Sequence, residues 1–156
     1  MPQLRPVRSS DLDLICRHRQ EMFRESGRPP AQVAAMADPF REWLAPRLAD
    51  GRYFGWIVEE GGAPVAGLGM MEIDWPPHPL HPREARRGYI LNVYVEPGFR
   101  RRGLARLLME TAQEEARRRG IGYAILHATD QGRALYEALG WTDTAEMALS
   151  IGAPLA

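Results

Sequence analysis

The 156-residue sequence has little cysteine, no excess of charge and no long hydrophobic segment. Its one cysteine, Cys16, excludes a disulfide within the chain and favours a reducing, cytoplasmic environment. Basic and acidic side chains number 20 each, which argues against a broad surface for nucleic acid. No apolar run approaches membrane-spanning length, and the first residues lack the apolar segment of a signal peptide. We therefore expect a soluble cytoplasmic protein that binds neither nucleic acid nor membranes.

Residues that could bind a metal are also few. His78 and His81 have a spacing found in metal sites, but prolines flank both of them and no helix fixes their separation. No further cluster of ligand-type residues lies nearby, so we expect no metal cofactor. Cys16 falls on the apolar stripe of a helical pattern, where a cysteine packs more often than it reacts.

The length and composition, 45% hydrophobic and 26% charged, are those of one globular domain spanning residues 1–156. Strand-type patterns cover residues 4–7, 53–59, 64–74, 87–95, 123–129 and 147–151. Helical patterns begin at Ser10 with a capping box to Asp13, continue over 31–48 with interruptions at Pro39 and Pro46, and cover 103–119 and 132–139. This order of elements predicts a mixed α/β fold.

Three consecutive arginines, Arg100, Arg101 and Arg102, stand where a strand ends and a helix begins, in EPGFRRRGLARLL at residues 96–108. A helix N-terminus carries free N–H groups and the positive end of the helix dipole, so cations there cost stability unless an anion binds. A second arginine triplet, residues 117–119, ends the same helix after Glu114 and Glu115, and we expect it to be a solvated surface. The first triplet favours an anion site, with solvated turn residues as the alternative.

Gly103 lets the backbone of this turn come close to a ligand, and Ala105 keeps the next turn position small. Together with the cations, these features favour a pyrophosphate. The segment has neither the Gly-Lys-Ser/Thr of a Walker loop nor the three glycines of the Rossmann motif. Nucleic-acid binding through the arginines is a weaker alternative, because no aromatic residues interleave with them.

Two longer segments resemble motifs of the GNAT acetyltransferase superfamily. NVYVEPGFRRRGLARLLME, residues 92–110, is similar to its acyl-CoA-binding motif, whose core Gln/Arg-x-x-Gly-x-Gly/Ala corresponds here to Arg100, Gly103 and Ala105. LHATDQGRALYEALGW, residues 126–141, resembles the following strand–helix motif, with Trp141 in place of the usual phenylalanine. LRPVRSSDLDLI, residues 4–15, is similar to the first strand and helix, so the resemblance covers nearly the whole chain.

This resemblance implies a central, mostly antiparallel mixed sheet that splays open between its fourth and fifth strands and is flanked by helices. It implies acetyl-CoA as co-substrate, with the pantetheine arm along the fourth strand and the pyrophosphate on the turn that follows. The residues that the resemblance assigns to acetyl-CoA are Val93, Tyr94, Val95, Arg100, Arg101, Arg102, Gly103, Leu104, Ala105, Arg106 and Thr129.

The resemblance also assigns catalytic roles. Tyr136 matches the residue that commonly protonates the coenzyme A sulfur, a role that suits a phenol protonated at neutral pH. Packing beside the neighbouring leucines is the alternative for Tyr136. The fourth strand lacks the glutamate that many members use as a base, so Glu72 and Asp74 on the third strand are candidates, with strand-end solvation equally open. Asn92, a polar residue in an apolar strand, would position substrate or water, or satisfy a bulge.

The function expected from these features is N-acetyl transfer from acetyl-CoA to a primary amine, by direct attack in a ternary complex. The acceptor, a small molecule or a protein N-terminus or lysine, is not defined by the sequence, and a homodimer is left open. The alternative is a module of the same fold that binds acyl-CoA as a sensor without turnover.

Overall fold

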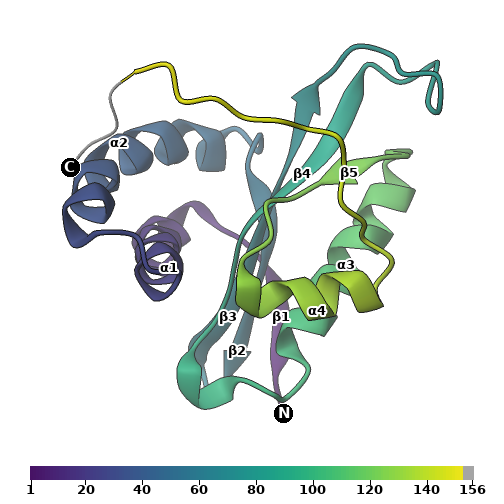
Figure 1. Cartoon of the computed structure of the whole chain (residues 1–156). Coiled ribbons are helices and arrows are strands. Elements are labelled where there is room, and N and C mark those ends of the chain that lie inside the picture. The colour runs from purple at the N-terminus through teal and green to yellow at the C-terminus, as the bar shows by residue number, and fades with distance from the viewer. Residues whose placement is uncertain (153–156) are drawn as a thin grey trace.

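The computed structural model describes residues 1–152, which build one five-stranded sheet with helices on both faces (Figure 1). The strands are β1 (Gln3–Pro6), β2 (Phe54–Glu60), β3 (Ala63–Asp74), β4 (Arg86–Val95) and β5 (Ala124–Ile125). The helices are α1 (Leu12–Glu25), α2 (Pro30–Ala49), α3 (Leu104–Arg118) and α4 (Asp130–Ala138). Sheet order follows chain order, and all neighbours are antiparallel except β4 and β5. The expected mixed, mostly antiparallel sheet is confirmed.

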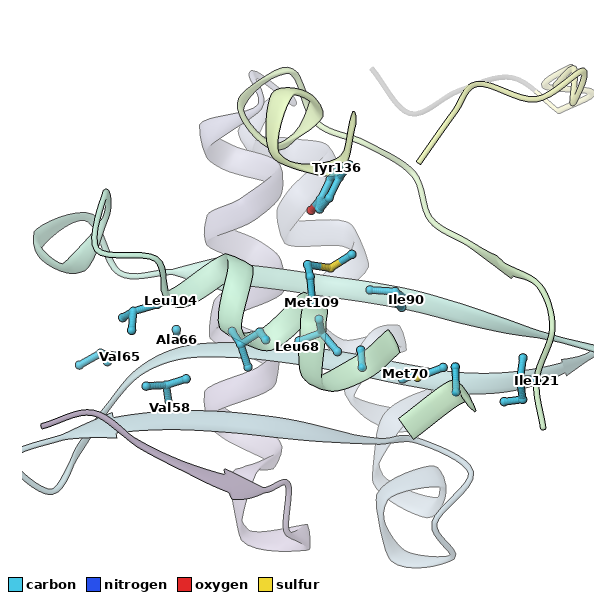
Figure 2. Close-up of a cluster of buried hydrophobic side chains, with 13 residues drawn as sticks. Val58, Val65, Ala66, Leu68, Met70, Ile90, Leu104, Met109, Ile121 and Tyr136 are labelled. Carbon is cyan, nitrogen blue, oxygen red and sulfur yellow. The ribbon is translucent and has the colours of Figure 1, made fainter. Parts of the chain in front are cut away.

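Each face of the sheet has its own hydrophobic core. Helices α1 and α2 lie on one side and α3 and α4 on the other (Figure 1). The cluster on the α1–α2 side contains Ile15, Cys16, Phe40, Leu44, Leu48 and Tyr53. Cys16 is 2% exposed, so its predicted packing role is confirmed. The cluster on the α3 side, drawn in Figure 2, is larger. It includes the four-residue repeat of α3, Leu104, Leu108, Ala112 and Ala116.

The sheet opens between β4 and β5. These strands pair at two positions, Gly88 with Ala124 and Tyr89 with Ile125, after which they separate. The strand expected over residues 123–129 is therefore much shorter, and residues 90–95 of β4 have no β5 neighbour. This is the splayed arrangement that the motif resemblance implied.

A bulge interrupts β4 beside this opening. Gly67 pairs with Tyr94 and Gly69 with Leu91, so one residue of β3 faces both Asn92 and Val93. Asn92 has φ of 55°, a left-handed conformation that asparagine tolerates better than most residues. The bulge changes the alternation of side chains, so that Asn92 faces α1 while Val93 packs against the cluster on the α3 side.

Several predicted boundaries were wrong. Helix α2 continues through Pro39 and Pro46. Each proline removes one backbone donor from the helix, but burial of Phe40, Leu44 and Leu48 on one face offsets that loss. Residues 147–151 form no strand and are exposed. Helix α4 begins at Asp130, two residues before the expected start, because Thr129 caps it by accepting a hydrogen bond from the Gly132 N–H.

The start of α1 also differs from the expected capping box. Ser10 belongs to a 3₁₀ turn, Ser9–Asp11, and α1 begins at Leu12. The carboxylate at this helix start is that of Asp11, which accepts hydrogen bonds from the Arg8 N–H at 2.7 Å and from the Arg5 side chain. Asp13 pairs instead with Arg41 across to α2.

Candidate active site

The turn between β4 and α3 presents unused backbone N–H groups. Gly103 caps α3 in a left-handed conformation, with φ of 79°, and no side chain caps the helix. The first intrahelical bond runs from the Leu107 N–H to the Gly103 carbonyl at 3.0 Å. The N–H groups of Leu104, Ala105 and Arg106 therefore have no acceptor within the helix, at the positive end of its dipole. This arrangement suits an anionic group.

The three arginines of this turn have different surroundings. Arg100 donates from Nε to the Val95 carbonyl at 2.9 Å and from Nη2 to Glu25 at 2.6 Å. Arg102 donates to Glu60 at 2.8 Å. Arg101, with φ of 62°, forms no hydrogen bond or ion pair with residues 1–152 through its side chain. A left-handed conformation costs about 1 kcal/mol or more for such a residue. Arg101 therefore adopts a strained backbone conformation at the position where its guanidinium is free.

A cavity of about 670 Å³ extends from this turn along β4 to α4. Its walls come from the end of α1, the last residues of β4, the β4–α3 turn and the first two turns of α4. Ten of the eleven residues assigned to acetyl-CoA line it, namely Val93, Tyr94, Val95, Arg100, Arg101, Gly103, Leu104, Ala105, Arg106 and Thr129, together with Tyr136. Arg102 does not line it, because its guanidinium turns toward Glu60 on β2.

Three of the four candidate catalytic residues, Glu72, Asp74 and Asn92, do not line this cavity either. Glu72 lies on β3 opposite Gly88, where Arg86 and Arg119 donate hydrogen bonds to its carboxylate at 2.8 and 3.2 Å. Partial burial acts to raise the pKa of Glu72, but the two guanidinium groups outweigh it and lower the pKa below its ordinary value. This placement argues against Glu72 as a general base, since two cations stabilise its ionised form. Its neighbour Asp74 is exposed at the end of β3.

Asn92 is 4% exposed, on the opposite side of β4 from the α3 core. Its amide donates to the Tyr53 hydroxyl at 3.1 Å and accepts from Arg19 at 2.7 Å. The bulge was one of the two uses expected for Asn92, and the structure shows it.

Tyr136 belongs to both the core and the cavity. Its side chain projects from α4 toward the apolar cluster beside Met109 of α3 (Figure 2), and the residue is 8% exposed. Its ring packs on Gly132, where a Cβ would come within 2.7 Å of the ring. Its hydroxyl bonds to no residue among 1–152. Burial raises the pKa of Tyr136 above its ordinary value of 10.0, which keeps the phenol protonated.

Three cavity residues at the C-terminal end of α1 were not predicted from the sequence. Met22, Glu25 and Ser26 line the cavity beside β4. Glu25 accepts hydrogen bonds from Arg100 and from the Tyr94 hydroxyl, so it joins α1 to both the strand and the turn. A glutamate near a helix end carries no local signal for such a role, because its partners lie 69 and 75 positions away in the chain.

A sheet that opens beside a helix N-terminus, with a cavity joining the two, is the architecture of an acyl-CoA-dependent acyltransferase. The sequence matches the acetyltransferase (GNAT) family over residues 13–141, so the chain belongs to this family and is an acyltransferase.

Solved structures and a curated protein agree with this assignment. A GCN5-related N-acetyltransferase from Ralstonia eutropha JMP134 is 56% identical, with a TM-score of 0.96 over 97% of this chain and 99% of that one. A predicted acetyltransferase from Clostridium acetobutylicum, crystallised with acetyl-CoA, is 28% identical, with a TM-score of 0.87 over 97% and 96%. The uncharacterized N-acetyltransferase YjgM of Escherichia coli K12 is 29% identical over 143 residues, which are 90% of this chain and 81% of that protein.

Within residues 1–152, no group of three or more His, Cys, Asp or Glu side chains is arranged to hold a metal ion. The histidine pair instead makes a local turn, in which the His81 N–H donates to the His78 carbonyl at 2.8 Å. No helix in this part of the chain is both long and apolar enough to cross a membrane.

Proposed function

We propose that this chain transfers the acetyl group of acetyl-CoA to a primary amine by direct attack in a ternary complex. The observation that carries the proposal is the single cavity that joins the free N–H groups of α3 to Tyr136 beside the opening of the sheet. The clostridial structure, which holds acetyl-CoA and shares 28% identity over nearly the whole chain, supports the choice of co-substrate.

The two ends of the cavity suit the two ends of the coenzyme. The N–H groups at residues 104–106 and the free guanidinium of Arg101 would bind phosphate oxygens. Val93 and Val95 lie on the part of β4 that has no β5 neighbour, so the pantetheine amides would pair there like an added strand. This orientation directs the thioester toward the bulge and Tyr136.

In the reaction, the neutral amine nitrogen attacks the carbonyl carbon of the thioester, and a C–N bond forms as the carbonyl oxygen becomes an oxyanion. Backbone N–H groups near Val93 would stabilise the oxyanion. The carbonyl then re-forms as the C–S bond breaks with its electron pair on sulfur, and the Tyr136 hydroxyl protonates the departing thiolate. The attacking nitrogen loses a proton to solvent to give the amide, and solvent returns a proton to the Tyr136 phenolate. With Glu72 held by two arginines outside the cavity, we assign the proton of the ammonium group to solvent rather than to a carboxylate.

Acetyl-CoA titration and an amine-dependent assay of free thiol test this function. The acceptor panel would hold small amines, amino acids, and peptides with a free N-terminus or a lysine, with products identified by mass spectrometry. All 20 basic side chains are arginines, so the enzyme contributes no lysine that would be acetylated in the background. Binding without amine-dependent thiol release would favour the sensor alternative, and absence of binding would contradict both functions.

We also propose a homodimer, formed through the C-terminal segment. Met147, Leu149 and Ile151 are 94%, 84% and 93% exposed, at the two-residue spacing of a strand. Among residues 1–152 no strand pairs with the outer edge of β5, so a second copy offers both a partner strand and an apolar surface. Analytical ultracentrifugation should show a dimer, and replacement of Met147 and Leu149 by aspartate should give monomers. A monomeric wild-type chain at micromolar concentration would contradict the dimer.

A further inference from the structure

Arg19 of α1 has a charged edge with no protein partner. Its Nη1 donates to the Asn92 side-chain oxygen at 2.7 Å. Its Nε is sealed from solvent and has no hydrogen-bond partner among residues 1–152. Its Nη2 also bonds to no residue in that range, but unlike Nε it remains accessible to solvent. Nη2 is therefore the nitrogen of this guanidinium that an incoming anion can reach, and a carboxylate there would form a charge-assisted hydrogen bond.

The charge of Arg19 is not balanced by any acid in the described chain. No Asp or Glu among residues 1–152 lies within ion-pair distance of it, whereas Arg17 and Arg24 of the same helix each pair with a glutamate. The guanidinium lies over the rings of Phe23 and Phe40, with centroids at 4.9 and 4.6 Å. Burial in this aromatic setting lowers the pKa of Arg19. An anion bound at this position would replace the lost hydration.

Arg19 lies next to the end of the cavity where the thioester is expected. Met22, which lines the cavity, is three residues further along α1 and so on the same helix face. Asn92, which holds Arg19, precedes Val93, which also lines the cavity. Arg19 is therefore beside the bulge, in the middle of the unpaired stretch 90–95 of β4.

The orientation of Arg19 is set by buried contacts. The Asn92 amide donates to Tyr53, which directs the Asn92 oxygen toward Arg19. Tyr53 reaches Asn92 by crossing Gly69, where a Cβ would lie 1.9 Å from the Tyr53 hydroxyl. A purely structural clamp between α1 and α2 would need the aromatic contacts but not an unpaired charged edge beside the cavity.

We propose that Arg19 binds a carboxylate of the acceptor, and that the acceptor is an amine with a carboxylate near it, such as a free α-amino acid. This inference rests on the proposed acetyl transfer and names the class of its acceptor. An α-amino acid carries its amine and carboxylate on one carbon, so a carboxylate on Arg19 places the amine next to the bulge and the thioester. A protein N-terminus or a lysine side chain within a peptide lacks such a carboxylate.

The test compares each α-amino acid with its carboxamide as acceptor, in wild type, Arg19→Gln and Arg19→Lys. The matched control is Arg24→Gln, an exposed arginine of the same helix that pairs with Glu21. We expect wild type and Arg24→Gln to prefer the acid. Arg19→Gln should lower kcat/KM for the acid by about 10- to 100-fold, the effect of losing a charge-assisted hydrogen bond. The carboxamide rate should change little, and Arg19→Lys should restore part of the preference.

Two outcomes would overturn the proposal: equal use of acids and carboxamides by wild type, or an acid preference that survives Arg19→Gln. A structural role would lower both rates together, and the thermal midpoint and acetyl-CoA affinity of each variant check for that effect. If acetyl-CoA binds but no amine is acetylated, the proposed transfer fails, and calorimetry still decides the carboxylate site. Protein saturated with CoA should then bind an amino acid but not its amide, and absence of that binding in wild type contradicts the site.

Discussion

The Nη2 of Arg100 lies 2.6 Å from the carboxylate of Glu25, and this contact joins the end of α1 to the turn before α3. The same side chain bonds to the Val95 carbonyl at the end of β4. Arg100 therefore holds the walls of the cavity together, while Arg101, its neighbour in the chain, remains free for a ligand. Because Arg100 supports the structure and Arg101 is free to bind, substitutions within the triplet should differ in their effect on CoA affinity.

We expect Arg101→Gln to weaken CoA binding by about 10-fold and Arg102→Gln to leave it unchanged, because Arg102 pairs with Glu60 outside the cavity. Calorimetry with CoA and with dephospho-CoA, which lacks the ribose 3′-phosphate, measures the difference. If Arg101 contacts the 3′-phosphate, its loss affects CoA but not dephospho-CoA. Equal effects of the two substitutions would show that the triplet acts only as diffuse charge.

Gly103→Val should abolish measurable binding of acetyl-CoA. A Cβ at Gly103 contacts no protein atom within 4 Å, so it would occupy the open space through which a phosphate approaches the N–H groups. The left-handed φ of 79° adds a backbone cost of about 1–2 kcal/mol. Gly98→Ala is the matched control, since a Cβ there also meets nothing and its φ is not positive. Unchanged affinity in Gly103→Val would remove the pyrophosphate from this turn.

Tyr136→Phe should lower kcat by about 10²–10⁴-fold with little change in acetyl-CoA affinity, because the hydroxyl would act only in the transition state. The ring keeps its packing on Gly132, so the variant should fold. Steady-state kinetics beside a binding titration separate the two effects. Since burial raises the pKa of Tyr136 above 10.0, wild-type kcat should not fall between pH 8 and 9.5 through loss of this proton. Full turnover by the Phe variant would leave Tyr136 as a packing residue.

His18 should make stability depend on pH in the acid range. It is 2% exposed, and burial, with a smaller effect of Arg17, lowers its pKa from 6.5 to about 4 despite the nearby Glu96. Between these values the unfolded chain binds a proton that the folded chain does not, so stability falls as pH decreases from about 6.5 to 4. The loss is about 3 kcal/mol at most.

Urea unfolding of wild type and His18→Gln across pH 4–8 measures this dependence. The variant should lose most of the slope between pH 4 and 6.5, and His127→Gln, whose side chain is 68% exposed, should keep it. An unchanged slope in His18→Gln would mean that other groups cause the acid destabilisation.

Local pattern alone determined most of the elements. The four-residue spacing of Leu104, Leu108, Ala112 and Ala116 predicted the buried face of α3, and all four are buried. Glycine before a helix and arginines at its start indicated an anion site, and the N–H groups are indeed free there. These signals were readable because they arise from the geometry of one helix or one turn, with partners a few residues away.

Contacts between distant segments decided the rest. Which arginine of the triplet is free depended on Glu25 and Glu60, and the position of Glu72 outside the cavity depended on Arg86 and Arg119. Helix α2 passes through Pro39 and Pro46 because packing of its apolar face outweighs the missing donors. The unpaired edge of Arg19 appeared only once α1, α2 and the β4 bulge were brought together, since a residue's hydrogen-bond partners and desolvation are properties of the assembled chain.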